Sequence, residues 1–122
     1  MLWSLVILSS GITAFFAVKY TTLKLRVAFA DDQVRLFEWT RASANATKDP
    51  QRLSGQLEQV VNYYPSGSKQ LVGTQLDRVV EAARSNAVAA IIGRLRAVTG
   101  RDLGDSPEKW LKDYPPSANR RK

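Results

Sequence analysis

Residues 2–18 read LWSLVILSSGITAFFAV, and this stretch decides how the rest of the chain is interpreted. It carries no charge, and its polar residues are serines and a threonine, whose hydroxyls can hydrogen-bond to carbonyls of their own helix. As a helix it rises about 26 Å, slightly less than the roughly 30 Å hydrocarbon core of a bilayer. Lys19 can extend to the headgroups, and Trp3 and Tyr20 suit the two interfaces. We therefore expect residues 1–20 to form a transmembrane anchor. Its apolar and interfacial side chains are Leu2, Trp3, Leu5, Val6, Ile7, Leu8, Ile12, Phe15, Phe16, Val18 and Tyr20.

The charges around this segment predict its orientation. No basic side chain precedes it, whereas Lys19, Lys24, Arg26 and Arg35 follow it. The positive-inside rule then places the N-terminus outside and the C-terminal domain in the cytoplasm. The same four cations are the side chains that we expect to contact lipid headgroups, so membrane lipid is a predicted partner.

A cleaved signal peptide is the alternative interpretation of the N-terminus. The tripeptide Ala28-Phe29-Ala30 has the small-residue pattern that a signal peptidase recognises, and cleavage there would export a soluble domain that begins at Asp31. Two features favour the anchor: no positive region precedes the apolar stretch, and a long basic segment separates it from the cleavage pattern. A core helix of a soluble protein is a further reading, which conflicts with the terminal position and unbroken apolarity.

The composition restricts the chemistry that the chain can perform. Its 122 residues include no cysteine and no histidine, so the thiol nucleophile, the commonest general base and the usual zinc ligands are missing. Asp102, Asp105 and Glu108 are three residues apart but lack the ligand number and glycine placement of a calcium loop. We therefore predict that the protein is not an enzyme and has no catalytic residues, no cofactor, no metal site and no small-molecule substrate.

The formal net charge is +7, from 18 Lys and Arg against 11 Asp and Glu, and every basic residue follows position 18. Such a charge suits anionic lipid, and it would also attract nucleic acid. The candidate nucleic-acid patch combines three arginines with two aromatic side chains for base stacking. These residues are Arg94, Arg96, Arg101, Tyr63 and Tyr64. Because no recognised binding motif accompanies them, nucleic acid is retained only as a second alternative.

Residues 21–48 are expected to form a juxtamembrane helix and a connection. Apolar residues recur there at spacings of three and four, which is typical of a helical seam. They are Tyr20, Leu23, Val27, Ala30, Val34 and Phe37. This stripe could pack on the chain's own helices or mediate self-association. Residues 23–29 also alternate as an exposed strand would, and the small polar residues 43–48 suit a connection.

Residues 49–116 predict a small helical domain. Asp49-Pro50 can begin a helix that stops at the turn at residues 64–68, and Thr74 with Asp77 resembles a capping box for the next one. Residues 69–72 could already be helical ahead of Gly73. Gly100 ends the long helix, and Pro107 opens a short helix in which Trp110 closes the core. Residues 117–122 are expected to be a disordered basic tail.

The long helix changes character along its length. Its first half has a polar face that includes Asp77, Arg78, Glu81 and Arg84, whereas residues 87–92, AVAAII, are apolar all round. A helix that is apolar on every side must be covered on more than one side. The segment is therefore the centre of the domain or an interface with another chain. The predicted partner interface consists of Ala87, Val88, Ala90, Ile91 and Ile92.

The stretch from Leu95 to Trp110, LRAVTGRDLGDSPEKW, resembles the closing segment of bacterial HEAT-type helical-repeat proteins. In that family a long helix ends in a Thr-Gly turn, an Asp and a second Gly follow, and a downstream Trp packs back. The resemblance covers roughly a quarter of the chain and carries no catalytic residues. It implies a helical hairpin with a capped end that is used for protein contacts, whereas a repeat array needs several units.

Together these patterns predict an all-α protein in which an N-terminal transmembrane helix precedes a small helical bundle, or a helical hairpin, with a short capping helix. The predicted function is that of a single-pass, non-catalytic membrane protein with an interaction or scaffold domain, such as a small accessory subunit of a membrane assembly. Its partners would be lipid and either another protein or a second copy.

Overall fold

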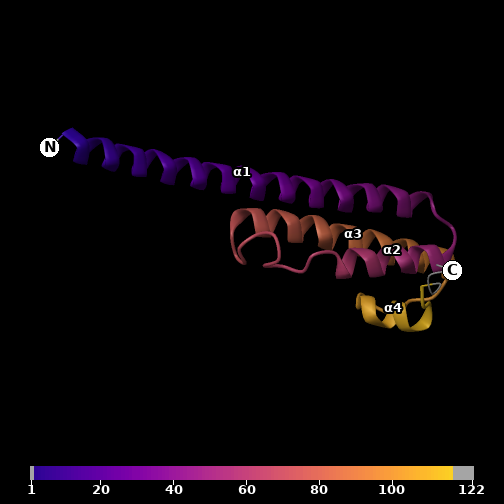
Figure 1. The fold of residues 1–122 in the computed structure, drawn as a ribbon. Helices are drawn as coiled ribbons and strands as arrows, with labels where there is room; N and C mark the ends of the chain where they lie inside the picture. Colours follow the sequence, from indigo (N-terminus) through magenta and orange to yellow (C-terminus); the bar gives the residue numbers. More distant parts are fainter. Residues whose placement is uncertain (1, 117–122) are drawn as a thin grey trace, which may run out of the picture.

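A computed structural model describes residues 2–116. This part of the chain has no strand and contains the helices α1 (Leu2–Ala46), α2 (Pro50–Asn62), α3 (Gln75–Thr99) and α4 (Pro107–Asp113) (Figure 1). The all-α prediction is thereby confirmed for residues 2–116. The predicted tail at residues 117–122 lies outside the described residues.

Helix α1 is one continuous helix of 45 residues. It contains no proline, and Gly11 is its only glycine. The strand alternative for residues 23–29 is wrong, because the three-four spacing extends further than the short alternation. The connection expected at residues 43–48 is also shorter than predicted. Because Ala and Ser are tolerated inside a helix that packs on a neighbour, α1 continues to Ala46.

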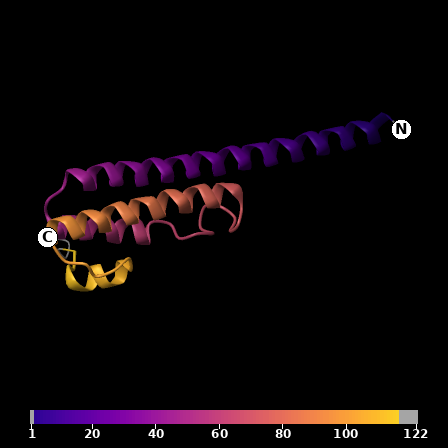
Figure 2. The ribbon, with the colours of Figure 1, turned by 180° about the vertical axis from the view of Figure 1, so that it is seen from behind.

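The helices lie roughly side by side, with α2 running back along the second half of α1 and α3 running forward again beside both (Figure 1). The short α4 lies on the side of α2 and α3 that faces away from α1 (Figure 1). The first half of α1 projects beyond the other helices, as the view from behind also shows (Figure 2). The long connection between α2 and α3 lies at the end of the packed helices that faces this projecting half.

The core is formed by all four helices and includes the second half of α1. Phe37 is fully buried, and the small residues Ala30, Thr40 and Ala44 let α1 approach α3 closely. The remaining buried apolar residues are Leu53, Leu57, Val60, Val80, Ala83, Ala87, Ile91, Ile92, Leu95 and Trp110. The packed helices therefore include α1 from near Ala30 onward, as well as the segment after residue 49 that the helix signals predicted.

The predicted helix ends are confirmed where local signals are strong. The Asp49 carboxylate accepts a hydrogen bond from the Gln51 amide at 3.0 Å, with Pro50 at the first helical position. The Thr74 hydroxyl accepts one from the Asp77 amide at 3.3 Å. Gly100 ends α3 in the left-handed conformation, with φ at 67°, and its amide donates to the Arg96 carbonyl.

Helix α4 closes the far end of the core through Trp110. This side chain is fully buried, and its indole N–H donates to the Gly104 carbonyl at 2.8 Å. Its ring also stacks on Tyr114. The buried Ser54 hydroxyl of α2 donates to the Tyr114 carbonyl, so the end of α4 is attached to α2. A buried indole with its N–H satisfied stabilises the position of the whole segment after α3.

Two predictions for α3 require correction. Ala87, Ile91 and Ile92 lie in the core, so these three side chains of the predicted partner interface are not available to a partner. Only Val88 and Ala90 of that group remain half-buried. On the face predicted to be polar, Asp77 and Arg84 turn inward, because Asp77 accepts hydrogen bonds from the Ser66 hydroxyl and the Gly73 amide and Arg84 donates to the Val60 carbonyl.

Candidate membrane-facing site

The projecting half of α1 carries large apolar side chains that contact no other helix. Trp3 is 82% exposed and Phe16 is 65% exposed. The other predicted anchor residues whose side chains are described are equally uncovered: Val6, Ile7, Leu8, Ile12, Phe15, Val18 and Tyr20. The side chains of Leu2 and Leu5 lie outside the described residues. Among residues 2–116, α1 is the one helix that is long and apolar enough to cross a membrane.

The polar side chains of this half are partly satisfied within the helix. The Thr13 hydroxyl donates to the Ser9 carbonyl at 2.9 Å, as predicted. Thr21 and Thr22 donate in the same way to Ala17 and Val18, each at 2.9 Å. A hydroxyl that bonds to its own helix needs no water, so these residues are compatible with an apolar environment.

The structure does not bring the four predicted headgroup cations to one level. Lys19 lies back over the Phe15 ring, with its Nζ 4.8 Å from the ring centroid, and Lys24 lies over Tyr20 at 4.7 Å. Both fold toward the N-terminus because helical side chains point that way. Arg35 is about 22 Å beyond Tyr20 along the helix axis and pairs with Asp31 at 2.8 Å, so it lies apart from the other three.

The connection between α2 and α3, residues 63–74, adds a surface beside these cations that the sequence did not indicate. Residues 69–72 are not helical, contrary to one expectation, since Gly67 and Gly73 adopt positive φ values of 88° and 77° and turn the chain. Leu71 and Val72 follow each other at the outer edge and are 58% and 73% exposed. In the sequence, two adjacent apolar residues between two glycines were the signal that could have revealed this surface.

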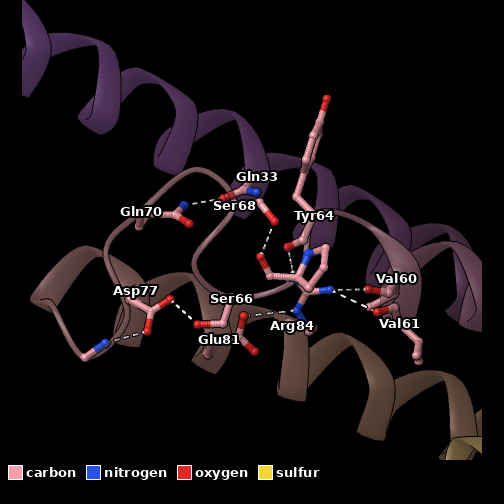
Figure 3. Close-up of polar contacts among 12 residues, drawn as sticks. Gln33, Val60, Val61, Tyr64, Ser66, Ser68, Gln70, Asp77, Glu81 and Arg84 are labelled. Carbon is pink, nitrogen blue, oxygen red and sulfur yellow. Dashed lines mark hydrogen bonds and ion pairs between the residues drawn. The ribbon is translucent and has the colours of Figure 1, made fainter.

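This loop packs against α1 through Lys69 and Gln70. The Lys69 ammonium lies 4.6 Å from the centroid of the Phe29 ring and 4.5 Å from that of Tyr64, so the cation is held between two aromatic faces. The buried Gln70 amide donates to the Gln33 side-chain carbonyl (Figure 3). The loop is therefore attached to α1 just beyond the projecting half.

The carboxylate of Asp77 braces the loop from α3. It accepts a hydrogen bond from the Ser66 hydroxyl at 2.7 Å and another from the Gly73 amide at 2.9 Å (Figure 3). These two bonds, the first being the stronger influence, hold the pKa of Asp77 below its ordinary value although partial burial opposes them. The ionised form of Asp77 is therefore the one that fits this loop.

Arg84 of α3 joins α2 to the start of the loop. Its guanidinium donates to the carbonyls of Val60 at 2.7 Å, Val61 at 3.3 Å and Tyr64 at 2.6 Å (Figure 3). The Val60 and Val61 carbonyls are in the last turn of α2, where carbonyls lack partners within the helix and the helix dipole favours a cation, and the Tyr64 carbonyl belongs to the loop. The guanidinium also lies 4.9 Å from the centroid of the Phe37 ring. Arg84 thus ties three helices together.

The candidate nucleic-acid patch does not form a free cationic surface. Arg94 donates to the Thr47 carbonyl at 2.8 Å, and Arg96 pairs with Asp102 at 2.8 Å and with Asp105 at 2.7 Å. Arg101 pairs with Asp113 at 3.0 Å. Tyr63 and Tyr64 lie near the opposite end of the packed helices, beside Phe37 and Lys69. Of the acidic residues considered as a cation site, Asp102 and Asp105 pair with Arg96, whereas Glu108 accepts a hydrogen bond from the Ser106 hydroxyl. Residues 2–116 contain no cluster suited to a metal ion.

One end of the packed helices therefore combines three features: the uncovered apolar part of α1, the braced loop at residues 63–74 and several cations. Protein-family models, curated proteins and solved structures include no match to this chain.

Proposed function

We propose that the protein is a single-pass, non-catalytic membrane protein in which α1 anchors a small helical interaction domain at the membrane surface. The observation that carries this proposal is the projecting half of α1, which is apolar on all sides and touches no other helix. Covering a large apolar side chain is worth about 1.5–3 kcal/mol, so a row of them left in water would be strongly unfavourable. Lipid is the partner that covers every side of a lone helix at once.

The anchor can be tested directly, since the chain has no native cysteine. We expect the full-length protein to remain with membranes after alkaline carbonate extraction. In intact cells, we expect a single cysteine at Ala89, which is exposed on α3, to react with a membrane-impermeant maleimide only after the cells are opened. A cysteine at Ser4, exposed near the start of α1, is the matched reporter for the other side. Release by carbonate would contradict the anchor, and the reverse labelling pattern would contradict the orientation.

Trp39 supports the proposal of a protein-binding domain. It is 64% exposed, and it lies about 28 Å beyond Tyr20 along the axis of α1, well past the headgroup layer. Lipid therefore does not account for its exposure. Exposed tryptophans are enriched among the residues that dominate binding at protein interfaces. The resemblance of residues 95–110 to HEAT-type proteins points to the same use.

The partner-binding surface is tested by Trp39→Ser, with Val79→Ser as the matched control, because Val79 is an exposed apolar residue on α3. Chemical crosslinking in native membranes should give a larger species with the wild-type chain and with Val79→Ser, and much less of it with Trp39→Ser. Mass spectrometry of that species separates a second copy from another protein. Equal crosslinking by both variants would show that Trp39 is not part of the interface.

A second candidate function is an exported soluble domain that begins at Asp31. One observation favours it: the Ala28-Phe29-Ala30 pattern coincides with the place where α1 changes from exposed to buried. Cleavage there would remove the uncovered half and leave Gln33, Phe37, Thr40 and Ala44 packed on the other helices. The intact mass of the protein from its native host distinguishes the two, since a mature chain starting at Asp31 contradicts the anchor.

A further inference from the structure

The loop at residues 63–74 lies at the level where an anchored domain would meet the bilayer. Leu71 and Gln70 line a groove together with Leu23 and Arg26 of α1. If Tyr20 marks the edge of the hydrocarbon, Leu23 lies about 5 Å and Arg26 about 9 Å further along the axis. Each headgroup layer is about 5–8 Å thick. The outer edge of the loop is therefore within reach of the headgroups.

The chemistry of this edge matches a lipid surface. Leu71 and Val72 are the exposed apolar pair, and Leu23 and Val27, which share one face of the adjacent part of α1, are also exposed. Cations surround it, namely Lys19, Lys24, Arg26 and Lys69. Three acidic residues lie at this end: Asp31 is paired with Arg35, Asp32 lies beside Phe29 and Lys69, and Asp77 is buried against Ser66 and Gly73. Apolar side chains among cations suit an anionic leaflet.

The loop is also held in place before any contact with lipid. Asp77 accepts hydrogen bonds from both ends of the turn, at Ser66 and Gly73, and the Thr74 hydroxyl donates to the Leu71 carbonyl at 2.7 Å. Gln70 attaches the middle of the loop to Gln33. A surface that is already ordered loses little conformational entropy on binding.

We propose that residues 63–74 form a second membrane contact, in which Leu71 and Val72 enter the headgroup layer of an anionic leaflet while Lys69 and Arg26 bind lipid phosphates. This contact rests on the proposed anchoring by α1 and goes beyond it, because it gives the domain a defined face toward the membrane. The occupant is the bilayer that already surrounds the anchor, so the two contacts are continuous.

The test uses the full-length chain reconstituted in vesicles, with single cysteines at Leu71, Val72 or Ala89 labelled with an environment-sensitive fluorophore. In vesicles of phosphatidylcholine and phosphatidylglycerol, the labels at Leu71 and Val72 should shift to the blue and gain intensity severalfold, whereas the label at Ala89 should remain in water. Lys69→Glu should reduce the change, and pure phosphatidylcholine should weaken it. All three labelled positions are exposed, so labelling preserves the core.

The failure of the loop contact and that of the anchor are distinguishable. The chain could resist carbonate extraction while the labels at Leu71 and Val72 report the same aqueous environment as the label at Ala89. This result overturns the loop contact alone. A chain that carbonate releases overturns both. An equal response in both lipid mixtures overturns the preference for an anionic leaflet, while quenching of the Leu71 label by nitroxide-labelled headgroups supports the loop contact itself.

Discussion

The half of α1 that is richer in large apolar residues is the less buried of its two halves. The half up to Phe29 holds most of the large apolar residues of the helix, yet these side chains are exposed, and only its end meets the loop between α2 and α3. The half from Ala30 onward is buried on one side through Gln33, Thr40, Ala44 and a single large apolar residue, Phe37. The more polar half thus belongs to the core. The comparison teaches that the angular distribution of apolar residues, rather than their number, decides which part of α1 the other helices cover.

The largest expected difference between the two halves of α1 is the loss of stability when one phenylalanine in each half is replaced by alanine. Phe37→Ala should destabilise the packed unit by about 3–5 kcal/mol, because a fully buried ring is lost from beside Arg84. Phe16→Ala should leave that stability unchanged, since Phe16 contacts no other helix. Thermal unfolding of the detergent-solubilised chain, followed by circular dichroism, measures both. Similar losses for the two variants would show that the uncovered half is folded against the domain after all.

A charge placed in the uncovered half should act on membrane insertion. Ile12→Arg puts a guanidinium near the middle of the proposed span, which costs roughly 3 kcal/mol of insertion free energy. The fraction of chain that resists carbonate extraction should fall accordingly. Ala42→Arg, at an exposed position of the packed half, is the control and should extract like the wild type. Unchanged extraction of Ile12→Arg would contradict a span centred there.

Arg84 provides a test within the packed helices. Arg84→Met keeps much of the side-chain volume but removes the donors to the Val60, Val61 and Tyr64 carbonyls, which should cost about 2–3 kcal/mol. Arg78→Met is the control, since Arg78 is exposed and bonds only to Gln75 within its own helix. The same unfolding measurement separates them. Near-equal stability of the two variants would mean that the end of α2 is satisfied without Arg84.

The smallest effect should be the pH dependence that Asp77 confers on the loop. Because the pKa of Asp77 is lower in the folded protein than in the unfolded chain, its stabilisation is complete above the unfolded value near 4 and is lost as pH falls through the folded pKa. Asp77→Asn should therefore lose the part of the acid sensitivity that comes from Asp77. Asp102→Asn is a control for carboxylates far from the loop, since the Gly104 amide and Arg96 lower the pKa of Asp102. Identical pH profiles for the wild type and Asp77→Asn would contradict this role.

The sequence predicted the features that depend on neighbouring residues. Asp49, Thr74 and Gly100 act through backbone groups within four residues, so their roles can be recognised without knowing the fold. The position of Trp110 in the core was predictable for a similar reason, since a tryptophan in a short helix after a long one has few other places to go.

The inward roles of Arg84 and Asp77 could not be predicted in this way. Arg84 lies 20 or more residues from the carbonyls that it binds, and Asp77 lies 11 residues from Ser66. A charged residue on a helix is usually solvated, and only the close approach of α2 and the loop makes burial favourable. For the same reason the sequence could not decide between core and interface for Ala87, Ile91 and Ile92, which are buried in the structure because α1 and α2 both pack against α3.

The unbroken course of α1 has a mechanical consequence. With no proline, and with Gly11 as its only glycine, the helix has no hinge between the apolar half and the core. Tilting of a membrane span by about 20° is common. Over the roughly 39 Å from Tyr20 to Ala46, such a tilt would displace the far end sideways by about 13 Å. Because Leu71 and Val72 lie on one side of α1, contact with lipid would favour one direction of tilt. The thickness of the bilayer would then determine the height of Trp39 above the membrane surface.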